Sequence, residues 1–184
     1  EFYMNHIKGA LNIPVWDLKF YLDFLEDKSV RVYCGARAKR SKMAVEYLED
    51  NNIDVEEIPP EELDDYEYVG EEMITAINYL SVKPGHEDEF EEKVEDLCGK
   101  TMDKPGFIGT KVFRTTNISF GGSMIPGEYE EIEIKPTKYV MLTYWEDKES
   151  HEKFHDIDEI MEGFKEIMPH ISKTPHEEFA EIIH

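Results

Sequence analysis

Apolar and polar positions follow two different periodicities along the chain, and these predict where its helices and strands lie. In the first part, short apolar runs predict strands at 30–34 and 55–58, and helical spacing of apolar residues predicts helices at about 16–26 and 41–51. Strands that alternate with helices in this way are typical of an α/β unit. We therefore expect one α/β module over residues 1–58.

Residues 59–72 continue neither periodicity. The segment opens with Pro59 and Pro60, and all the charged residues that follow within it are acidic. A charged segment that starts with prolines and lacks periodicity is typical of a partly extended linker. We expect an acidic linker here, which separates the first module from a second domain over 73–184.

The second domain has the predicted order strand, helix, strand, strand, helix, strand. This order is typical of an α+β fold, so we expect a partial α/β module followed by an α+β domain. The strands in this order are 73–83, 107–115, 138–145 and 178–184, and the helices are 86–102 and 147–168; a further strand is expected at 129–134.

Asn78 is the most informative polar residue in the first strand of this domain. Alternation along a strand puts its side chain on the same face as Ala76 and Leu80. An amide on an apolar face costs about 1–3 kcal/mol unless its hydrogen bonds are satisfied. Either a backbone group satisfies Asn78, or its side chain lines a cavity that holds a ligand.

The composition is strongly acidic and excludes some classes of partner. The chain has 20 Lys and Arg residues against 42 Asp and Glu residues, a formal net charge of −22. Phosphate binding needs clustered cations, so this charge argues against nucleic acid and anionic membranes as partners. No apolar run approaches the length of a membrane span. Two cysteines in unlike settings do not indicate a disulfide framework, so we expect a cytoplasmic protein.

Cys34 ends the first predicted strand, beside a basic segment of this acidic chain. From Arg31 to Lys42 every charged residue is basic. A helix N-terminus and nearby cations both favour a thiolate, which is the nucleophilic form of cysteine. The alternative is a small buried apolar residue, and this is what we expect for Cys98, which lies within a helical pattern. We predict Cys34 to be catalytic.

Two separated motifs surround Cys34. The sequence HIKGALNIP at 6–14, with Asn5 where glycine is usual, is followed about twenty residues later by VRVYC and RSKMAVEYL. In order and spacing these motifs resemble rhodanese-like domains, over about residues 1–58. The resemblance implies that Cys34 accepts sulfur as a persulfide from a small-molecule donor, and that Arg40 stabilises the anionic donor. The other residues that it implies in donor binding are Gly35, Arg37, Lys39 and Ser41.

Two features of the first module depart from the rhodanese pattern. Five residues separate Cys34 from Arg40, where four are usual. The longer loop is similar to that of rhodanese-fold phosphatases and arsenate reductases, which is an alternative activity. The chain also opens at Glu1 inside the region that would hold the first strand and helix, so we expect this module to be incomplete at its N-terminus.

Three segments of the second domain carry a further resemblance. They are AINYLSVKPGHEDEFEEKV, KPGFIGTKVFR and YVMLTYWEDKESHEKFH. Over about 73–184 they resemble the antibiotic biosynthesis monooxygenase (ABM) family of ferredoxin-like domains. The resemblance implies a homodimer, in which two four-stranded sheets form an α/β barrel, and a pocket between each sheet and its helices.

The haem-degrading branch of this family has an asparagine at the position of Asn78, together with a tryptophan and an axial histidine on the second helix. Phe154 lies near the tryptophan position here, and Met168 and His170 lie near the histidine position. The resemblance implies that Asn78 is catalytic, that haem or another flat hydrophobic molecule is the ligand, and that His170 is the candidate axial ligand. Phe154, Phe164 and Met168 are the expected pocket residues.

His151 and His155 are four residues apart on a predicted helix, a spacing that can hold a metal ion. Their neighbours in the sequence are charged, and no third ligand is evident. We therefore expect both histidines on a solvated face; for His155, which is next to Phe154, the alternative is a place at the rim of a pocket. The predicted protein is a two-module enzyme, with sulfur transfer through Cys34 and a pocket with monooxygenase activity. The alternatives are a non-catalytic ligand sensor and a phosphatase-like or arsenate-reductase-like activity.

Overall fold

The computed structural model describes residues 6–34, 39–70, 73–116 and 136–181. The chain divides into two compact units, Glu1–Met73 and Ile74–His184. The strand predicted at 129–134 lies outside the described residues. So do Gly35 and Arg37, two of the residues expected to bind a sulfur donor.

Among its described residues, the first unit contains two small sheets. One pairs β2 with β3 in parallel, so that Val30 lies opposite Val55. Helix α2 connects these two strands, and the predicted strand–helix–strand order is confirmed. The core of this unit consists of buried Leu18, Leu25, Ala44, Leu48 and Ile53. The bounds are Val30–Val32 for β2, Lys39–Asp50 for α2 and Val55–Glu57 for β3.

The helix predicted at 16–26 is wrong in its length. The chain instead forms a 3₁₀ turn, η2 (Leu18–Phe20), and a one-turn helix, α1 (Leu22–Leu25). Tyr21 joins them with φ −118° and ψ 5°, outside the helical region. Two leucines at the ends of the segment still reach the core, which accounts for the apolar spacing that suggested a continuous helix.

Residues 59–72, predicted to be a linker, contribute secondary structure to the first unit. Pro60–Asp65 forms the 3₁₀ segment η3, and β4 (Tyr68–Val69) pairs antiparallel with β1 (His6–Ile7). The Lys8 amide donates to the Glu67 carbonyl at 2.9 Å, and the Lys8 ammonium lies 3.0 Å from the Glu67 carboxylate. The segment lacks periodicity because backbone pairing, rather than an apolar face, holds it.

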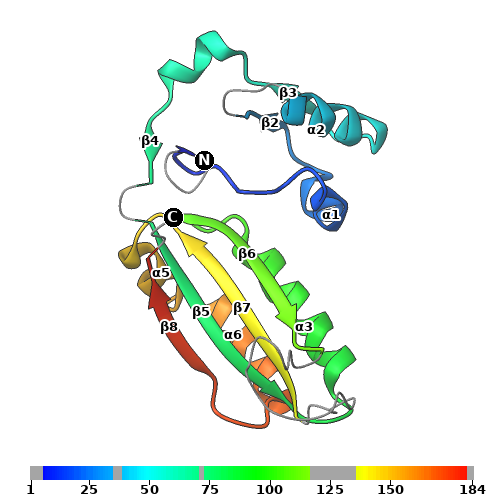
Figure 1. The fold of residues 1–184 in the computed structure, drawn as a ribbon, viewed down its shortest axis with the longest axis vertical. Helices are drawn as coiled ribbons and strands as arrows, with labels where there is room; N and C mark the ends of the chain where they lie inside the picture. The colour runs from blue at the N-terminus through cyan, green and yellow to red at the C-terminus, as the bar shows by residue number, and fades with distance from the viewer. Residues whose placement is uncertain (1–5, 35–38, 71–72, 117–135, 182–184) are drawn as a thin grey trace, which may run out of the picture. The chain divides into compact units, whose positions relative to one another are not determined.

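The second unit is a four-stranded antiparallel sheet of order β6-β7-β5-β8 with helices over one face (Figure 1). This is the mixed α+β, ferredoxin-like arrangement that the sequence predicted. The strands are β5 (Ile74–Val82), β6 (Phe107–Arg114), β7 (Thr137–Trp145) and β8 (His176–Ala180), and the helices are α3 (Glu87–Thr101), α5 (Lys148–Phe154) and α6 (Asp158–Ile167).

Helix α3 buries a stripe of residues spaced three and four apart, namely Phe90, Val94 and Leu97. Helix α6 packs against α3, and the two helices approach closely at Gly163. A Cβ atom at Gly163 would lie 2.7 Å from Leu97 Cδ1, so the close approach depends on the missing side chain.

The single helix predicted at 147–168 is wrong, because the chain forms two helices there. Asp147 caps α5 by accepting a 2.7 Å hydrogen bond from the Ser150 amide. Ile157 then has φ −85° and ψ 116°, an extended conformation that ends the first helix and precedes the second. The break gives α5 its own orientation, which is why His151 and Phe154 are both buried.

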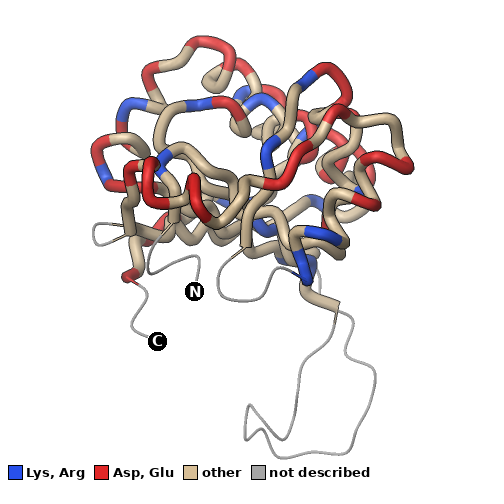
Figure 2. Tube along the Cα trace, turned by 90° about the horizontal axis from the view of Figure 1, so that it is seen from above, with Lys and Arg blue, Asp and Glu red and all other residues tan. Residues whose placement is uncertain are grey.

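Acidic residues are spread along the trace of the described chain rather than confined to one element (Figure 2). Within the described ranges, every helix is too short or too polar to cross a bilayer.

Candidate functional site

A small cavity lies within the second unit, with apolar walls and one polar end. Its volume of about 30 Å³ is enough for about two water molecules. The polar end is formed by Asn78, His151, His155 and Glu177. The aromatic lining residues are Phe107, Trp145, Phe154 and Phe164.

Asn78 and Glu177 form the centre of the polar end. They are direct partners in the pairing of β5 with β8, so their side chains lie on the same face of the sheet. Asn78 Nδ2 donates to Glu177 Oε1 at 2.7 Å. The sequence left two alternatives for Asn78, and the structure places it in the cavity lining, with a carboxylate rather than a backbone group as its hydrogen-bond acceptor.

His151 lies against the same carboxylate, with Nε2 3.5 Å from Glu177 Oε1. Its side chain is only 3% exposed, and its ring packs edge-on against Trp145 at 5.4 Å. Its second nitrogen, Nδ1, is buried and has no hydrogen-bond partner within the described ranges. The predicted solvated position of His151 is therefore wrong, because α5 turns this residue toward the sheet.

His155 is half-buried and stacks on Phe164, with ring centroids 5.8 Å apart and 22° between the planes. Of the two alternatives for this residue, the solvated face is wrong, and the place beside a pocket agrees with the structure, since its side chain lines the cavity. Burial, followed by the nearby His151, lowers the pKa of His155. A lowered pKa keeps the imidazole neutral at pH 7, so His155 can accept a proton.

Glu177 is ionised at pH 7, whereas His155 is neutral. Burial raises the pKa of its carboxyl, but hydrogen bonds from His151 and Asn78 outweigh burial and leave that pKa below its ordinary value. The polar end therefore holds an ionised carboxylate beside a neutral imidazole. Such a pair can orient a polar substrate group and remove a proton from it.

His151, His155 and Glu177 also offer three ligand atoms that all lie within 4.8 Å of one another. Glu177 is the third ligand that the sequence did not reveal. Its distance along the chain from the two histidines hid it, because only the register of β8 against β5 brings it to them.

Cys98 lines the cavity from α3, with Sγ 4.0 Å from Thr110 Oγ1. Burial raises the pKa of its thiol to about 11. The thiol therefore stays protonated at neutral pH, and this agrees with the structural role expected for Cys98.

The pocket residues expected from the resemblance are only partly brought together. Phe154 and Phe164 line the cavity with Asn78, whereas Met168 is exposed and neither Met168 nor His170 is part of the lining. Both residues lie in the turn η4 (Met168–His170), which follows α6. The structure therefore does not bring the candidate axial ligand to this cavity.

Cys34 follows β2 in the first unit, as expected, and is half-buried. Its Sγ lies 3.4 Å from Ser41 Oγ on α2, and Ser41 in turn hydrogen-bonds to Glu57 on β3. Lys39 and Arg40 are exposed at the start of α2. Of the described residues that we expected to bind the sulfur donor, Ser41 is in contact with Cys34.

A family described as "Antibiotic biosynthesis monooxygenase" matches residues 73–122. This match supports the second resemblance over residues 73–122, whereas the resemblance was expected over about 73–184. A search of curated proteins gave no match. None of these findings supports the rhodanese-like domain expected over 1–58, which stays a prediction.

Several solved structures resemble the chain. SnoaB from Streptomyces nogalater, described as a cofactor-independent oxygenase, is 14% identical, covers 61% of this chain and 95% of its own, and has a TM-score of 0.46. A putative antibiotic biosynthesis monooxygenase from Bordetella bronchiseptica is 20% identical over 62% of this chain and 100% of its own, with a TM-score of 0.47. A conserved protein from Methanosarcina mazei is 22% identical, covers 59% of this chain and 90% of its own, and has a TM-score of 0.45.

Glu177→Gln tests the charge state of the polar end. We expect it to lower the free energy of unfolding of the second unit by about 1–3 kcal/mol at pH 7, because Asn78 and the buried His151 lose their charged partner. A carboxyl whose pKa is lower in the folded than in the unfolded protein gives its full stabilisation of the fold above the unfolded-state pKa. This stabilisation is lost as the pH falls through the folded-state pKa. The difference from wild type should therefore disappear in acid, below the ordinary value of about 4.5.

Urea unfolding followed by Trp145 fluorescence in a Trp16→Phe background measures this, because the chain has two tryptophans. Glu178→Gln is the matched control, since Glu178 is exposed on the same strand and pairs with exposed His176. Equal stability of Glu177→Gln and wild type at pH 7 would contradict the assignment.

Proposed function

We propose that the second unit is an oxygenase that acts on a small apolar substrate bearing a weakly acidic C–H group. The observation that carries this proposal is the neutral His155 beside the ionised Glu177, at the polar end of an apolar cavity. The match of residues 73–122 to a monooxygenase family supports the same class of reaction.

His155 is the proton acceptor in this proposal. A methylene group flanked by carbonyls loses a proton to the imidazole, and the carbanion then transfers electrons to O₂ and forms a carbon–oxygen bond. The resulting peroxide takes up a proton to give a hydroperoxide, which loses water and leaves a carbonyl. The sum converts one CH₂ group and one O₂ into one C=O group and one water, so O₂ is the only oxidant needed.

Asn78 is the orienting group. One hydrogen of its amide is donated to Glu177, and the second is available to the enolate oxygen that forms when the substrate loses its proton. Glu177 fixes the orientation of that amide, and His151 in turn fixes Glu177. The aromatic walls exclude water from the carbanion.

The size of the cavity favours a small substrate. About 30 Å³ admits water-sized groups, so a larger molecule requires the aromatic walls to rearrange. Haem exceeds this volume, and the expected axial ligand His170 is not among the lining residues. We therefore propose a small carbonyl compound in place of haem as the ligand.

Replacing His155 tests the proposed proton acceptor. We expect His155→Ala to lower the kcat for O₂ uptake with a small 1,3-diketone such as acetylacetone by about 10²- to 10⁴-fold, the usual contribution of a general base. Wild-type activity should fall in acid only below the ordinary histidine value, because burial lowers the pKa of His155. An oxygen electrode gives both measurements.

The matched control is His176→Ala, which removes an exposed histidine of β8 from outside the cavity lining and should leave kcat unchanged. Uptake by wild type at the rate of buffer alone contradicts the proposal. Saturable diketone binding without turnover would favour the sensor alternative instead.

We also propose that the ABM domain forms a homodimer through the face of the sheet opposite the helices. Cross-strand pairing gathers Ile77, Tyr79, Phe113, Val140 and Leu142 on this face. Phe113 is 51% exposed, and Tyr79 is exposed as well. Exposed apolar side chains grouped on one sheet face are typical of an interface between proteins.

Phe113→Glu should convert the dimer to a monomer, because it places an unpaired charge within an apolar contact. Light scattering coupled to size-exclusion chromatography reports the mass. Phe20→Glu is the matched control, since Phe20 is an exposed phenylalanine of the first unit. A wild-type protein with the mass of one chain, or a Phe113→Glu variant with the mass of two, would exclude this interface.

Sulfur transfer by the first unit is the second candidate function. The observation in its favour is the placement of Cys34 after β2, with Sγ 3.4 Å from the Ser41 hydroxyl on the following helix. In this proposal the Cys34 thiolate attacks the outer sulfur of thiosulfate, releases sulfite and becomes a persulfide. Cyanide then takes the sulfur as thiocyanate and regenerates the thiolate.

Cys34→Ser should abolish thiosulfate:cyanide turnover, because a hydroxyl cannot carry the transferred sulfur. Cys98→Ser is the control and should keep the wild-type rate, since the Cys98 thiol stays protonated. Thiocyanate formation measured as its iron complex gives the rate. Hydrolysis of p-nitrophenyl phosphate without thiocyanate formation would instead favour the phosphatase-like alternative.

A further inference from the structure

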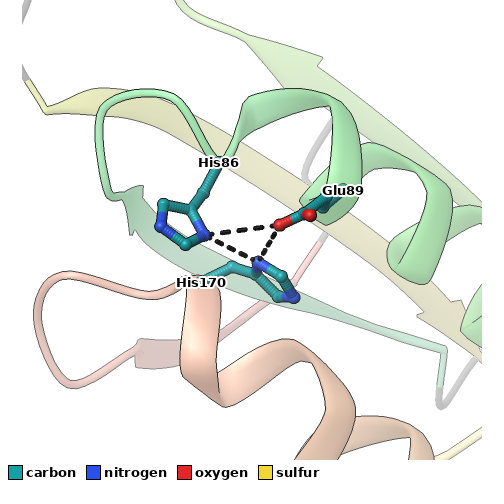
Figure 3. A group of neighbouring side chains, drawn as sticks. All are labelled: His86, Glu89 and His170. Atoms are coloured by element: carbon teal, nitrogen blue, oxygen red, sulfur yellow. Dashed lines mark hydrogen bonds and ion pairs between the residues drawn. The ribbon is translucent and has the colours of Figure 1, made fainter.

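A second cluster of side chains lies in the ABM unit, separate from the cavity lining. His86 precedes α3, Glu89 lies in its first turn, and His170 ends the turn η4 (Figure 3). The two Nδ1 atoms lie 3.1 Å apart. Glu89 Oε2 lies 3.5 Å from His86 Nδ1 and 3.4 Å from His170 Nδ1.

These three atoms form a nearly equilateral triangle of the size that one metal ion requires. Zinc binds histidine nitrogen at about 2.0–2.1 Å and carboxylate oxygen at about 2.0–2.2 Å, with tetrahedral geometry. In a tetrahedron of that size, neighbouring ligand atoms lie about 3.3–3.5 Å apart. The three measured distances agree with this value to within a few tenths of an ångström.

We propose that His86, Glu89 and His170 bind a divalent transition-metal ion of the zinc type. Imidazole nitrogen and carboxylate oxygen are ligands that such ions accept in proteins. Glu89 is exposed and His86 is partly exposed, so an ion can reach the site from solvent and keep a water molecule as its fourth ligand.

The backbone holds the two sides of the cluster together without the ion. The Lys83 amide donates to the His170 carbonyl at 2.9 Å, and the Lys83 ammonium donates to the Pro169 carbonyl at 2.5 Å. The His86 amide in turn donates to the Lys83 carbonyl at 3.1 Å. These bonds fix the backbone of both histidines relative to Lys83. The ion would therefore bind side chains that already lie close together.

The same three side chains could form a hydrogen bond and ion pairs in the absence of metal. One imidazole would then donate from Nδ1 to the other, with the carboxylate alongside. The two interpretations predict different behaviour toward added metal. The second group, His151, His155 and Glu177, is a competing location, so the experiment has to separate the two.

The test uses the full chain, prepared without a histidine tag and treated with a chelator, and measures Zn²⁺ binding by calorimetry. We expect His86→Ala, His170→Ala and Glu89→Gln each to weaken binding at least about tenfold, the lower limit seen when even an outer-shell partner of a ligand is lost. Co²⁺ should show visible absorption bands of a low-coordinate ion in wild type, and these should be lost in the same variants.

His155→Ala and His176→Ala are the controls and should bind Zn²⁺ as tightly as wild type. Glu89→Gln keeps the size of the side chain, so its circular dichroism spectrum should match that of the folded wild type. Its loss of metal affinity in calorimetry is then not caused by unfolding. Three outcomes would overturn the site: no Zn²⁺ binding by wild type, unchanged binding in the His86 and His170 variants, or loss of binding in His155→Ala instead. This site is independent of the oxygenase proposal, since its residues are not in the cavity lining.

Discussion

The hydrogen bond between Asn78 and Glu177 is the interaction on which the polar end of the cavity depends. The amide lies on the inner face of the sheet and needs an acceptor there, and the carboxylate, which is partly withdrawn from water, needs donors. Each group satisfies the other across the β5–β8 pair. His151 completes the arrangement at 3.5 Å, which keeps the carboxylate ionised despite its burial.

The cavity has a polar end and apolar walls, and residues in and next to α5 contribute to both. His151 and Phe154 lie in this short helix, and His155 directly follows its last residue. Two imidazoles and an aromatic ring therefore reach the same small volume. The extended conformation of Ile157 separates α5 from α6. The break lets the two helices take different directions, and both Phe154 on α5 and Phe164 on α6 line the cavity.

Much of this fold could be predicted from the sequence, because alternation and helical spacing report directly on local burial. They located β5, β7 and α3 to within about two residues, and they identified Asn78 as a polar residue on an apolar face. Contacts between distant segments were not predictable in this way. Glu177 reaches the site only through strand register, and β4 reaches β1 only through backbone pairing. The helix break depends on one backbone conformation, for which the apolar pattern gave no signal.

The close approach of α6 to α3 at Gly163 has a consequence for how this pocket can diversify. Leu97, which a Cβ atom at Gly163 would meet at 2.7 Å, is itself part of the cavity wall. A larger residue at this helix position would displace the leucine and so alter the space open to a ligand, while the hydrogen-bonded groups on the sheet stay in place. Related proteins could therefore acquire different ligand preferences through a distant helix–helix contact, with their chemistry conserved.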